Sequence, residues 1–404
     1  MRPIRLAVIF DQQISSGGGF QQALNAALLA KSLPDSLVEC VFFTNHHQSV
    51  ALLSTFDIPA HYIKFNIFQR LWARVRGSIT NTLVIKGIKR IQKYGPLERI
   101  LIKNRIDLVY FLSPTIFAKY LEHLNYITTV WDLCHRDDLE FPEVRSGREF
   151  EARDSNYHSI LPRATAILVD SEIGRENVVR RYAIDFERIH VLPFEASVTS
   201  QLSNQSKSNV NIRLKFNLDF SYVLYPAQFW AHKNHVYVLE GLKALESLYN
   251  IRIGAIFSGV DKGNKTYIEK YAKKLDLIDR VRFVGFLTNE EIVSLYQQSL
   301  ALVMPSYFGP TNLPPLEAFE LGVPVLYSDK LGLRDQVGDA ALLLNLNDPQ
   351  NMAEHVKNLI EDEGLRQRLV HSGRQRLAHF NAIDRREILK DIIKNYRWRR
   401  LCWE

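Results

Sequence analysis

Two charged residues in the second half of the chain have the surroundings of a ligand site. Glu317 stands in "FGPTNLPPLEAFELGVPVLYSD" after Pro314 and Pro315, which predict a helix start because first-turn N–H groups need no internal partner. A carboxylate there can accept hydrogen bonds from two sugar hydroxyls, and the N–H groups of a helix start can hold phosphate. A simpler explanation is the helix dipole, which favours a negative charge in the first turn.

Lys233 lies in "YPAQFWAHKNH", where a predicted strand ends and the next helix begins. A lysine at a helix start opposes the dipole, which favours an anionic partner such as phosphate. The alternative is an ordinary solvated surface charge. Ligands of open α/β sheets bind at the carboxyl ends of the strands, and both Lys233 and Glu317 are expected near such ends.

Apolar runs alternate with helical patterns along most of the chain, as in parallel sheets buried on both faces. We expect the strands of a first sheet at 4–10, 37–45, 106–113, 126–132, 166–171 and 188–194. A second series is expected at 221–227, 251–259, 281–286, 300–306, 323–329 and 340–345. The predicted fold class is therefore α/β, with two doubly wound Rossmann-like domains facing each other across a cleft.

A segment rich in Ser, Asn and Gln separates the two series of strands. We expect an N-terminal domain over 1–195, a linker over 196–215, a C-terminal domain over 216–380 and a final helical segment over 381–404.

The composition is that of a soluble globular protein. With 404 residues the chain is long enough for two domains, and 46% hydrophobic with 24% charged residues are ordinary values. Lys plus Arg exceed Asp plus Glu by 51 − 44 = 7, which suits anionic partners but also fits a moderately basic surface. The three cysteines form no CxxC pair, so neither a disulfide framework nor structural zinc is expected. We expect no signal peptide and no membrane-spanning segment.

Residues 64–105 mix large apolar side chains with many lysines and arginines and a single acid, Glu98. At helical spacing this composition predicts an apolar stripe beside a basic face, as in helices that lie on anionic lipid. The alternative is a helix packed on its own domain with a solvated basic side. No aromatic platform or groove-reading motif is present, so nucleic acid is not expected as a partner.

Four segments in the second half together resemble the retaining family 4 glycosyltransferases of GT-B fold. In the family's order and spacing they read "PAQFWAHKNH", "VRFVGFLTNEEI", "PSYFGPTNLPPLEAFELGVPVLYSD" and "VGDAALLLNLNDP". The first half is similar more loosely, in "SSGGGFQQALN", "TTVWDLCHRDDLEFPEV" and "ATAILVDSEIGRENV". The resemblance implies an acceptor-binding domain at 1–195 and a nucleotide-sugar-binding domain at 216–380, with 381–404 crossing back to the first. It also implies enzymes of bacterial surface-polysaccharide assembly, such as O-antigen or capsule synthesis.

The resemblance implies a role for several individual residues. Lys233 would pair with the donor diphosphate, and Glu317 would accept the ribose hydroxyls of the nucleotide. Phe286 and Leu287 match the loop that meets the nucleotide base. The glycine-rich loop near the donor phosphates and the acceptor corresponds to Gly17, Gly18 and Gly19. Without the resemblance, three adjacent glycines are a weak phosphate signal and do not indicate nicotinamide binding.

The chain departs from the family pattern at two positions. Family members usually carry a glutamate where this chain has Gly309, and an arginine where it has Gln228. The missing acid usually contacts the donor sugar, and the arginine its phosphates. We expect that the sugar contacts pass to the backbone around Gly309 and to its neighbours Thr311, Asn312 and Leu313.

In "VWDLCHRDDLEFPE" many family members have a His-Asp pair at a strand end. Asp132 matches that pair, and His135 lies just beyond it. Either residue could orient the acceptor hydroxyl, or His135 could be an ordinary loop residue. The charged run 136–138 is expected to be solvated, and the resemblance implies no metal.

Taken with these residues, the resemblance implies a retaining, metal-independent glycosyltransferase with no cofactor. It would move a sugar from a nucleotide-diphosphate sugar to a hydroxyl acceptor, a saccharide or a lipid-linked saccharide, in the cytoplasm or on the cytosolic membrane face. One alternative is a non-catalytic partner subunit that binds nucleotide sugar, because Gly309 and Gln228 replace expected polar groups. Another is a GT-B epimerase or phosphorylase.

Overall fold

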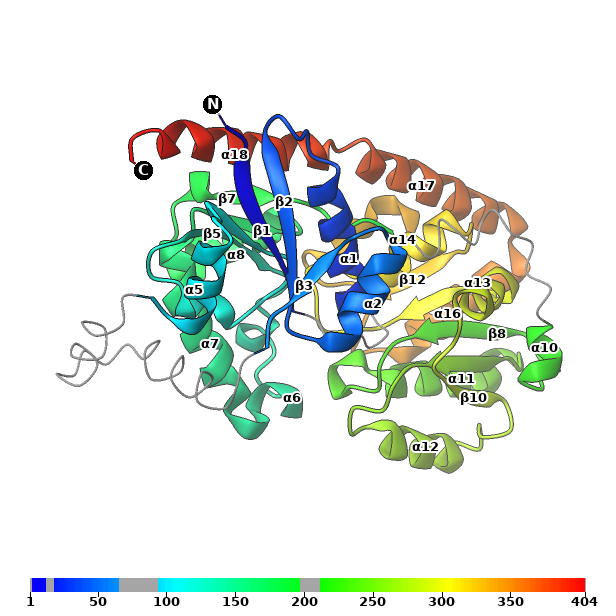
Figure 1. Cartoon of the computed structure of the whole chain (residues 1–404). Coiled ribbons are helices and arrows are strands. Elements are labelled where there is room, and N and C mark those ends of the chain that lie inside the picture. The colour runs from blue at the N-terminus through cyan, green and yellow to red at the C-terminus, as the bar shows by residue number, and fades with distance from the viewer. Residues whose placement is uncertain (1, 12–17, 65–93, 197–210, 404) are drawn as a thin grey trace. The chain divides into compact units, whose positions relative to one another are not determined.

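The computed structural model describes residues 2–11, 18–64, 94–196 and 211–403 (Figure 1). Contacts within the chain divide it into two compact units. The first comprises Met1–Leu133, Glu151–Pro193 and Asp384–Glu404, and the second comprises Cys134–Phe150 and Phe194–Ile383. Residues 134–150 thus group with the second unit, whereas the expected boundaries place them in the N-terminal domain.

The first unit is a seven-stranded parallel sheet in the order β3-β2-β1-β4-β5-β6-β7. Its strands are β1 Ile4–Phe10, β2 Val38–Thr44, β3 Ala60–Tyr62, β4 Leu108–Phe111, β5 Asn125–Val130, β6 Ala166–Val169 and β7 Ile189–Val191. Its helices are α1 Gly18–Lys31, α2 His47–Thr55, α5 Pro96–Lys103, α7 Glu149–Ile160, α8 Glu172–Tyr182 and α18 Arg385–Arg400.

Strand β1 shows why the sheet is built from unbroken apolar runs. Successive side chains of a strand point to opposite faces. Leu6 and Val8 join one buried cluster, with residues of α1 and α18, while Ala7 and Ile9 join a second cluster with residues of α5 and α7. Because both faces are covered, the strand is apolar at every position except Arg5, whose side chain pairs with Glu39.

The second unit is a six-stranded parallel sheet in the order β10-β9-β8-β11-β12-β13, around one buried cluster. Its strands are β8 Tyr222–Pro226, β9 Gly254–Ser258, β10 Val281–Gly285, β11 Leu302–Met304, β12 Val325–Ser328 and β13 Leu342–Leu344. Its helices are α6 Pro142–Arg145, α10 Ile212–Lys215, α11 His235–Tyr249, α12 Lys265–Lys274, α13 Asn289–Gln298, α14 Leu313–Glu320, α15 Leu333–Val337, α16 Pro349–Glu361 and α17 Glu363–Asn381.

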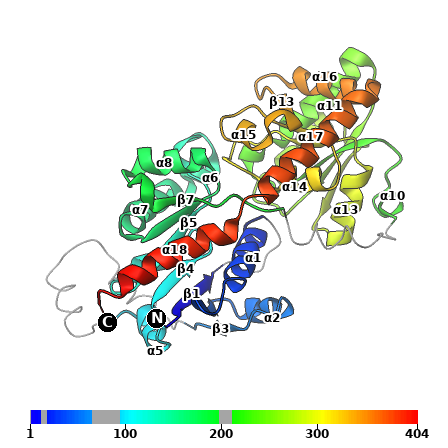
Figure 2. The same cartoon turned by 90° about the horizontal axis from the view of Figure 1, so that it is seen from above.

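The C-terminal helix α18 belongs to the first unit, where it lies beside α1 (Figure 2). Its Leu389 and Ile393 are fully buried in the cluster that also contains β1. Burying two such side chains is worth about 1.5–3 kcal/mol each, so the last helix is an integral part of this unit.

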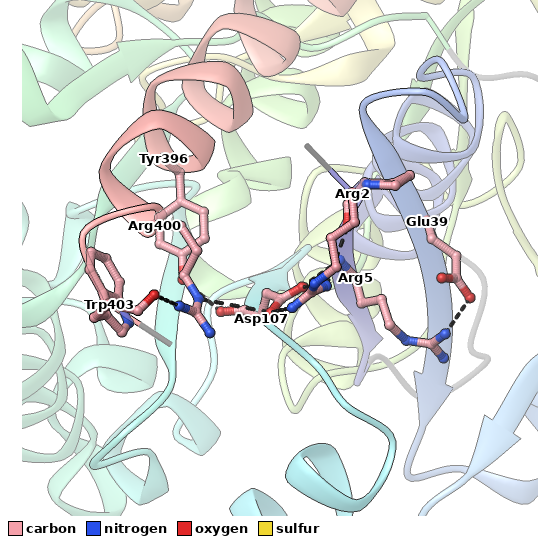
Figure 3. A network of polar contacts seen from close by, with 8 residues as sticks. Arg2, Arg5, Glu39, Asp107, Tyr396, Arg400 and Trp403 are labelled. Atoms are coloured by element: carbon pink, nitrogen blue, oxygen red, sulfur yellow. Dashed lines mark hydrogen bonds and ion pairs between the residues drawn. The ribbon is translucent and has the colours of Figure 1, made fainter.

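A polar network around Asp107 fixes the end of α18 to the start of β4 (Figure 3). The Asp107 carboxylate accepts two hydrogen bonds of 2.6 Å from the Arg2 guanidinium and one of 2.9 Å from the Arg5 amide. From α18, the Tyr396 hydroxyl donates to the Asp107 carbonyl at 2.7 Å, and Arg400 lies 3.9 Å from the carboxylate. The network therefore joins both ends of the chain to one buried aspartate.

The expected fold class is confirmed: both sheets are parallel and flanked by helices, with the strand orders of Rossmann-like domains. Each expected strand overlaps an observed one, but β3 is additional. In the expected linker, residues 197–210 lie outside the described part of the chain, while Ile212–Lys215 form the short helix α10.

Candidate functional site

Lys233 lies where the order of strands in the second sheet reverses. It ends a short 3-10 helix, Ala231–Lys233, between β8 and α11. Its Nζ donates hydrogen bonds to Ser306 Oγ at 3.3 Å and to Asn312 Oδ1 at 3.2 Å. Ser306 follows β11, the neighbour of β8 across the reversal, so the ammonium lies at the carboxyl ends of both strands. This topological switch point is the usual ligand position in such sheets.

Asn312 connects the lysine to helix α14. It is the N-cap residue of α14, yet its side chain makes no capping bond. Its Oδ1 accepts from Lys233, while its Nδ2 donates to the Phe308 carbonyl at 3.1 Å and to the Tyr327 hydroxyl at 2.8 Å. Gln336 holds the Asn312 backbone through both N–H and C=O, at 3.0 and 2.6 Å. The lysine and the helix start are thus fixed as one rigid assembly.

The start of α14 is a poorer phosphate site than the sequence suggests. The helix begins at Leu313, so Pro314 and Pro315 occupy its second and third positions. Proline has no N–H, and two of the first three donors of a normal helix start are therefore missing. The expectation that free N–H groups of this helix offset phosphate charge stays a prediction, and the few donors left make Lys233 the main positive group of the proposed site.

Glu317 is on the second turn of α14, since the first turn carries no acidic residue. The explanation of Glu317 by the helix dipole is therefore wrong, because the dipole acts mainly on the first turn. Burial raises the pKa of the Glu317 carboxyl, against the opposing effect of a 3.1 Å hydrogen bond from the Tyr296 hydroxyl. A carboxylate held in poorly hydrated surroundings costs stability, and this cost favours a ligand-binding role for Glu317.

The chain segment 134–150 holds the loop between β11 and α14. The Cys134 thiol donates to the Gly309 carbonyl at 2.9 Å. The ring of Phe141 packs against those of Tyr307 and Phe308, with centroids 5.1 and 5.5 Å away. Residues far apart in the sequence thus determine the shape of the "YFGPTN" loop.

A second set of contacts joins the same segment to the residue before Lys233. The Glu143 carboxylate accepts from the His232 backbone N–H at 2.8 Å and also contacts His232 Nδ1. Burial raises the pKa of Glu143, but the hydrogen bonds from His232 outweigh it, so the net pKa is lowered. The His232 ring stacks on Phe308 with centroids 3.9 Å apart. Sequence reasoning missed Glu143 and His232, since nothing local indicates a contact across 89 residues.

The charged run 136–138 was expected to be solvated, but one of its residues is paired. Asp138 forms an ion pair with Lys330, whose Nζ lies 2.9 Å from each carboxylate oxygen and 2.9 Å from the Tyr307 carbonyl. Lys330 follows β12 and reaches back to the same loop. Asp138 therefore helps to hold the loop beside Lys233.

Gly309, which stands where the family usually has glutamate, has no room for a side chain. A Cβ built there would lie 2.5 Å from Leu333 Cδ2 and 3.0 Å from its Cγ, and Leu333 is buried. Gln228, at the usual arginine position, accepts a 3.1 Å hydrogen bond from the Trp230 indole. The surroundings of both positions therefore fit the residues that this chain carries there.

The remaining predicted residues have different settings. The Phe286 side chain is 69% exposed after β10, as stacking on a base would require, whereas Leu287 and Leu313 are buried in or near the core. Thr311 lies half-buried beside Asn312. Gly18 and Gly19 begin α1 in the first unit, and Gly17 lies outside the described residues.

Asp132 and His135 have partners of their own. Asp132 follows β5 in the first unit and forms an ion pair with Arg153 at 2.7 Å. His135 is fully buried in the second unit, with its ring 5.8 Å from that of Phe150. The roles expected for these two residues stay predictions.

Residues 207–376, which contain Lys233 and Glu317, match the family model of glycosyl transferases group 1. This part of the chain is therefore similar to the glycosyl transferases group 1 family. The chain is 24% identical over 251 residues to O-antigen chain mannosyltransferase B of Escherichia coli, covering 61% of this chain and 65% of that protein. The matched region spans 65%, 52% and 55% of the length of three curated relatives, and 35% of that of a fourth, glycogen synthase of Mycobacterium tuberculosis.

Solved structures extend the similarity of fold beyond residues 207–376. WaaG, a glycosyltransferase involved in lipopolysaccharide biosynthesis, superimposes with a TM-score of 0.67 at 17% identity, over 96% of this chain and 99% of that one. Anabaena Alr3699/HepE in complex with UDP gives 0.65 at 16% identity, over 97% and 99%. At these identities the likeness shows the fold, which is GT-B: two Rossmann-like domains in one chain.

Proposed function

We propose that this protein is a retaining glycosyltransferase that moves a sugar from a nucleotide-diphosphate sugar to a hydroxyl acceptor. The observation that carries the proposal is Lys233, held by Ser306 and Asn312 at the strand switch point, with Glu317 on the helix that Asn312 begins. A fixed cation suits the diphosphate, and a nearby carboxylate suits ribose hydroxyls. The mannosyltransferase and UDP-bound proteins with which it shares similarity support this class of substrate.

In the proposed reaction the acceptor oxygen bonds to the anomeric carbon while the bond from that carbon to the diphosphate breaks. The diphosphate leaves with the electron pair, and the hydroxyl proton passes to one of its oxygens. Lys233 stabilises the charge that develops on the leaving oxygen. A preorganised charge of this kind needs no reorganisation during the reaction, which makes it effective in lowering the barrier.

A donor screen tests the proposal. Thermal shift with uridine, guanosine and thymidine diphosphate sugars identifies the donor, and donor consumption is then measured with a membrane lipid extract as acceptor. We expect a shift with one nucleotide and consumption that depends on the extract. Binding without consumption across the whole panel would favour the non-catalytic partner subunit instead.

We further propose that the transfer needs neither a metal nor a cofactor. Lys233 supplies the positive charge that a divalent cation supplies in other enzymes. Treatment with excess EDTA followed by desalting is therefore expected to leave at least about half of the turnover. A loss that is restored by adding Mg²⁺ or Mn²⁺ would contradict this part of the proposal.

We propose that the acceptor is a lipid-linked saccharide used in surface-polysaccharide synthesis, reached from the cytosolic face of a membrane. Among the described residues, no helix is both long and apolar enough to cross a bilayer. At the end of α18, Trp398, Leu401 and Trp403 are 65%, 58% and 47% exposed, beside the exposed Arg399. Exposed tryptophan with arginine suits the interface of an anionic membrane.

The basic segment 64–105 contributes less to this proposal than its sequence suggests. Residues 65–93 lie outside the described part of the chain. In the rest, α5 buries Leu97 and Leu101 in the core, as in the alternative of a helix packed on its own domain. Glu98 is fully buried and accepts from the backbone N–H groups of residues 122–124 at 2.6–2.9 Å.

Removing the exposed tryptophans tests the membrane proposal. A double variant, Trp398→Ala with Trp403→Ala, is expected to sediment severalfold less with vesicles that contain phosphatidylglycerol, because each indole contributes apolar area at the interface. Tyr267→Ala is a matched control, since Tyr267 is an aromatic residue of the second unit that is 54% exposed. Equal sedimentation of the double variant and the wild type would show that these tryptophans of the C-terminal segment do not contribute to membrane binding.

A further inference from the structure

The first sheet has a switch point of its own, and a carboxylate occupies it. The order β3-β2-β1-β4-β5-β6-β7 reverses between β1 and β4. Asp11 directly follows β1, and Ser113 follows β4 by two residues. The carboxyl ends of the strands that flank such a reversal are where open α/β sheets bind ligands.

The Asp11 side chain is held by hydroxyl groups. Ser113 Oγ donates to Asp11 Oδ1, and Thr115 also donates to the carboxylate. His46, which follows β2, contacts the Asp11 carbonyl through Nε2 at 3.1 Å. Among the described residues Asp11 forms no ion pair with lysine or arginine, although burial raises the pKa of its carboxyl.

Two other aspartates at strand ends of the same sheet have structural partners. Asp132, after β5, is paired with Arg153 at 2.7 Å. Asp170, directly after β6, accepts from Ser171 Oγ at 3.1 Å near the start of α8. Neither lies at the reversal between β1 and β4. Asp11 therefore combines the ligand position with a carboxylate that, within the described ranges, is paired with neither lysine nor arginine.

The charge at each switch point indicates which ligand each unit takes. Lys233 in the second unit suits phosphate, whereas a carboxylate repels phosphate and accepts hydrogen bonds from hydroxyl groups. We propose that Asp11 binds a hydroxyl of the acceptor sugar, and that this sugar unit is uncharged. Ser113 and Thr115 orient the carboxylate by occupying part of its hydrogen-bonding capacity. The inference rests on the proposed glycosyl transfer, and it adds the residue and the chemical class of the acceptor.

The test compares Asp11→Asn with Asp170→Asn, a matched change at another buried strand end of the same sheet. The probes are octyl glycosides of glucose, galactose, mannose and N-acetylglucosamine, together with the phosphorylated forms of the same sugars. Binding is measured by saturation-transfer NMR without donor, and acceptor KM is measured with the donor that the thermal-shift screen identifies. Because Asp11→Asn could unfold the protein, Ser113→Ala serves as a milder second variant.

We expect the wild type to bind one of the neutral glycosides in preference to its phosphorylated form. Asp11→Asn should weaken that binding, and raise the acceptor KM, by about 10- to 100-fold, the range of a hydrogen bond to a charged group. Ser113→Ala should have a smaller effect of the same kind. Donor affinity should stay within about twofold in each variant, and Asp170→Asn should leave glycoside binding unchanged.

The inference is overturned if no neutral glycoside binds, if Asp11→Asn binds as the wild type does, or if Asp170→Asn loses as much. The outcomes also separate the two proposals. Asp11-dependent glycoside binding without any donor consumption would reject glycosyl transfer alone. Transfer with an acceptor KM that is unaffected by Asp11→Asn would reject this inference alone.

Discussion

Replacing Lys233 with methionine is expected to lower kcat by about 10²- to 10³-fold, the effect of removing one preorganised stabiliser of a developing negative charge. The change keeps the length and most of the apolar stem of the side chain. Its effect should be large because Pro314 and Pro315 leave the start of α14 with few N–H donors that could replace the ammonium. Ser306 and Asn312 keep hydroxyl and amide groups at the site, but neither carries a positive charge.

Steady-state kinetics at saturating donor measure this effect, because kcat then reports the loss of transition-state stabilisation. Lys243→Met is the control, since Lys243 lies on the surface of the neighbouring helix α11 and pairs with Glu246 at 3.5 Å. A Lys233→Met enzyme that keeps its kcat within about threefold would contradict the proposed role of the lysine.

Replacing Glu317 with glutamine is expected to weaken nucleotide binding while leaving the fold at least as stable. Glutamine keeps the shape and a hydrogen bond with Tyr296, but it replaces a charged acceptor for the ribose hydroxyls with a neutral one. We expect a rise in the donor Kd of about fivefold, because hydrogen bonds to charged groups are roughly 1 kcal/mol stronger than neutral ones. Isothermal titration with the nucleoside diphosphate measures it, and Glu320→Gln on the next turn of α14 is the control.

The stability effect has a definite pH dependence. Burial raises the folded-state pKa of Glu317 above its unfolded value of about 4.3. The folded state thus binds the proton more tightly, which adds to the free energy of unfolding. This addition is fully present below the unfolded pKa and is lost as pH rises through the folded pKa. The Tm of Glu317→Gln minus that of the wild type should therefore increase from about pH 4 towards neutral pH. If this Tm difference instead falls between pH 4 and neutral pH, the fold stabilises the ionised form of Glu317, and the prediction is wrong.

Much of the fold could be predicted because a buried parallel strand is marked by a continuous apolar run. Leu6–Phe10 and Val325–Tyr327 are such runs, and both lie in strands. Strand β3 escaped prediction because Ala60–Tyr62 is a three-residue edge strand with mostly exposed side chains, which needs no such pattern. Glu317 was assigned to the wrong turn because helix starts are uncertain by a residue or two, and here Leu313 precedes the prolines.

The positions of Lys233 and Glu317 near element ends could be predicted, because Lys233 follows the strand that ends at Pro226 and Glu317 follows two prolines; their roles stay predictions. The contacts that hold them could not. Asn312 is of a residue type that favours helix N-caps, yet its side chain binds Lys233, 79 residues away in the sequence. Asp11 had a weaker signal, as the first polar residue after an apolar strand, and only the strand order shows that this strand borders the reversal.

The chain passes from one unit to the other after Leu133, Phe150, Pro193 and Ile383. Neither unit is therefore encoded by a continuous stretch of the gene. A recombination event near codon 195 would exchange most of the first unit together with residues 134–150. In that segment Cys134 contacts the loop between β11 and α14, and Glu143 contacts His232. In chimaeras made at that point, we expect the specificity of the proposed acceptor site and the geometry of this loop to be inherited together, unless residues 134–150 are taken from the source of the second half.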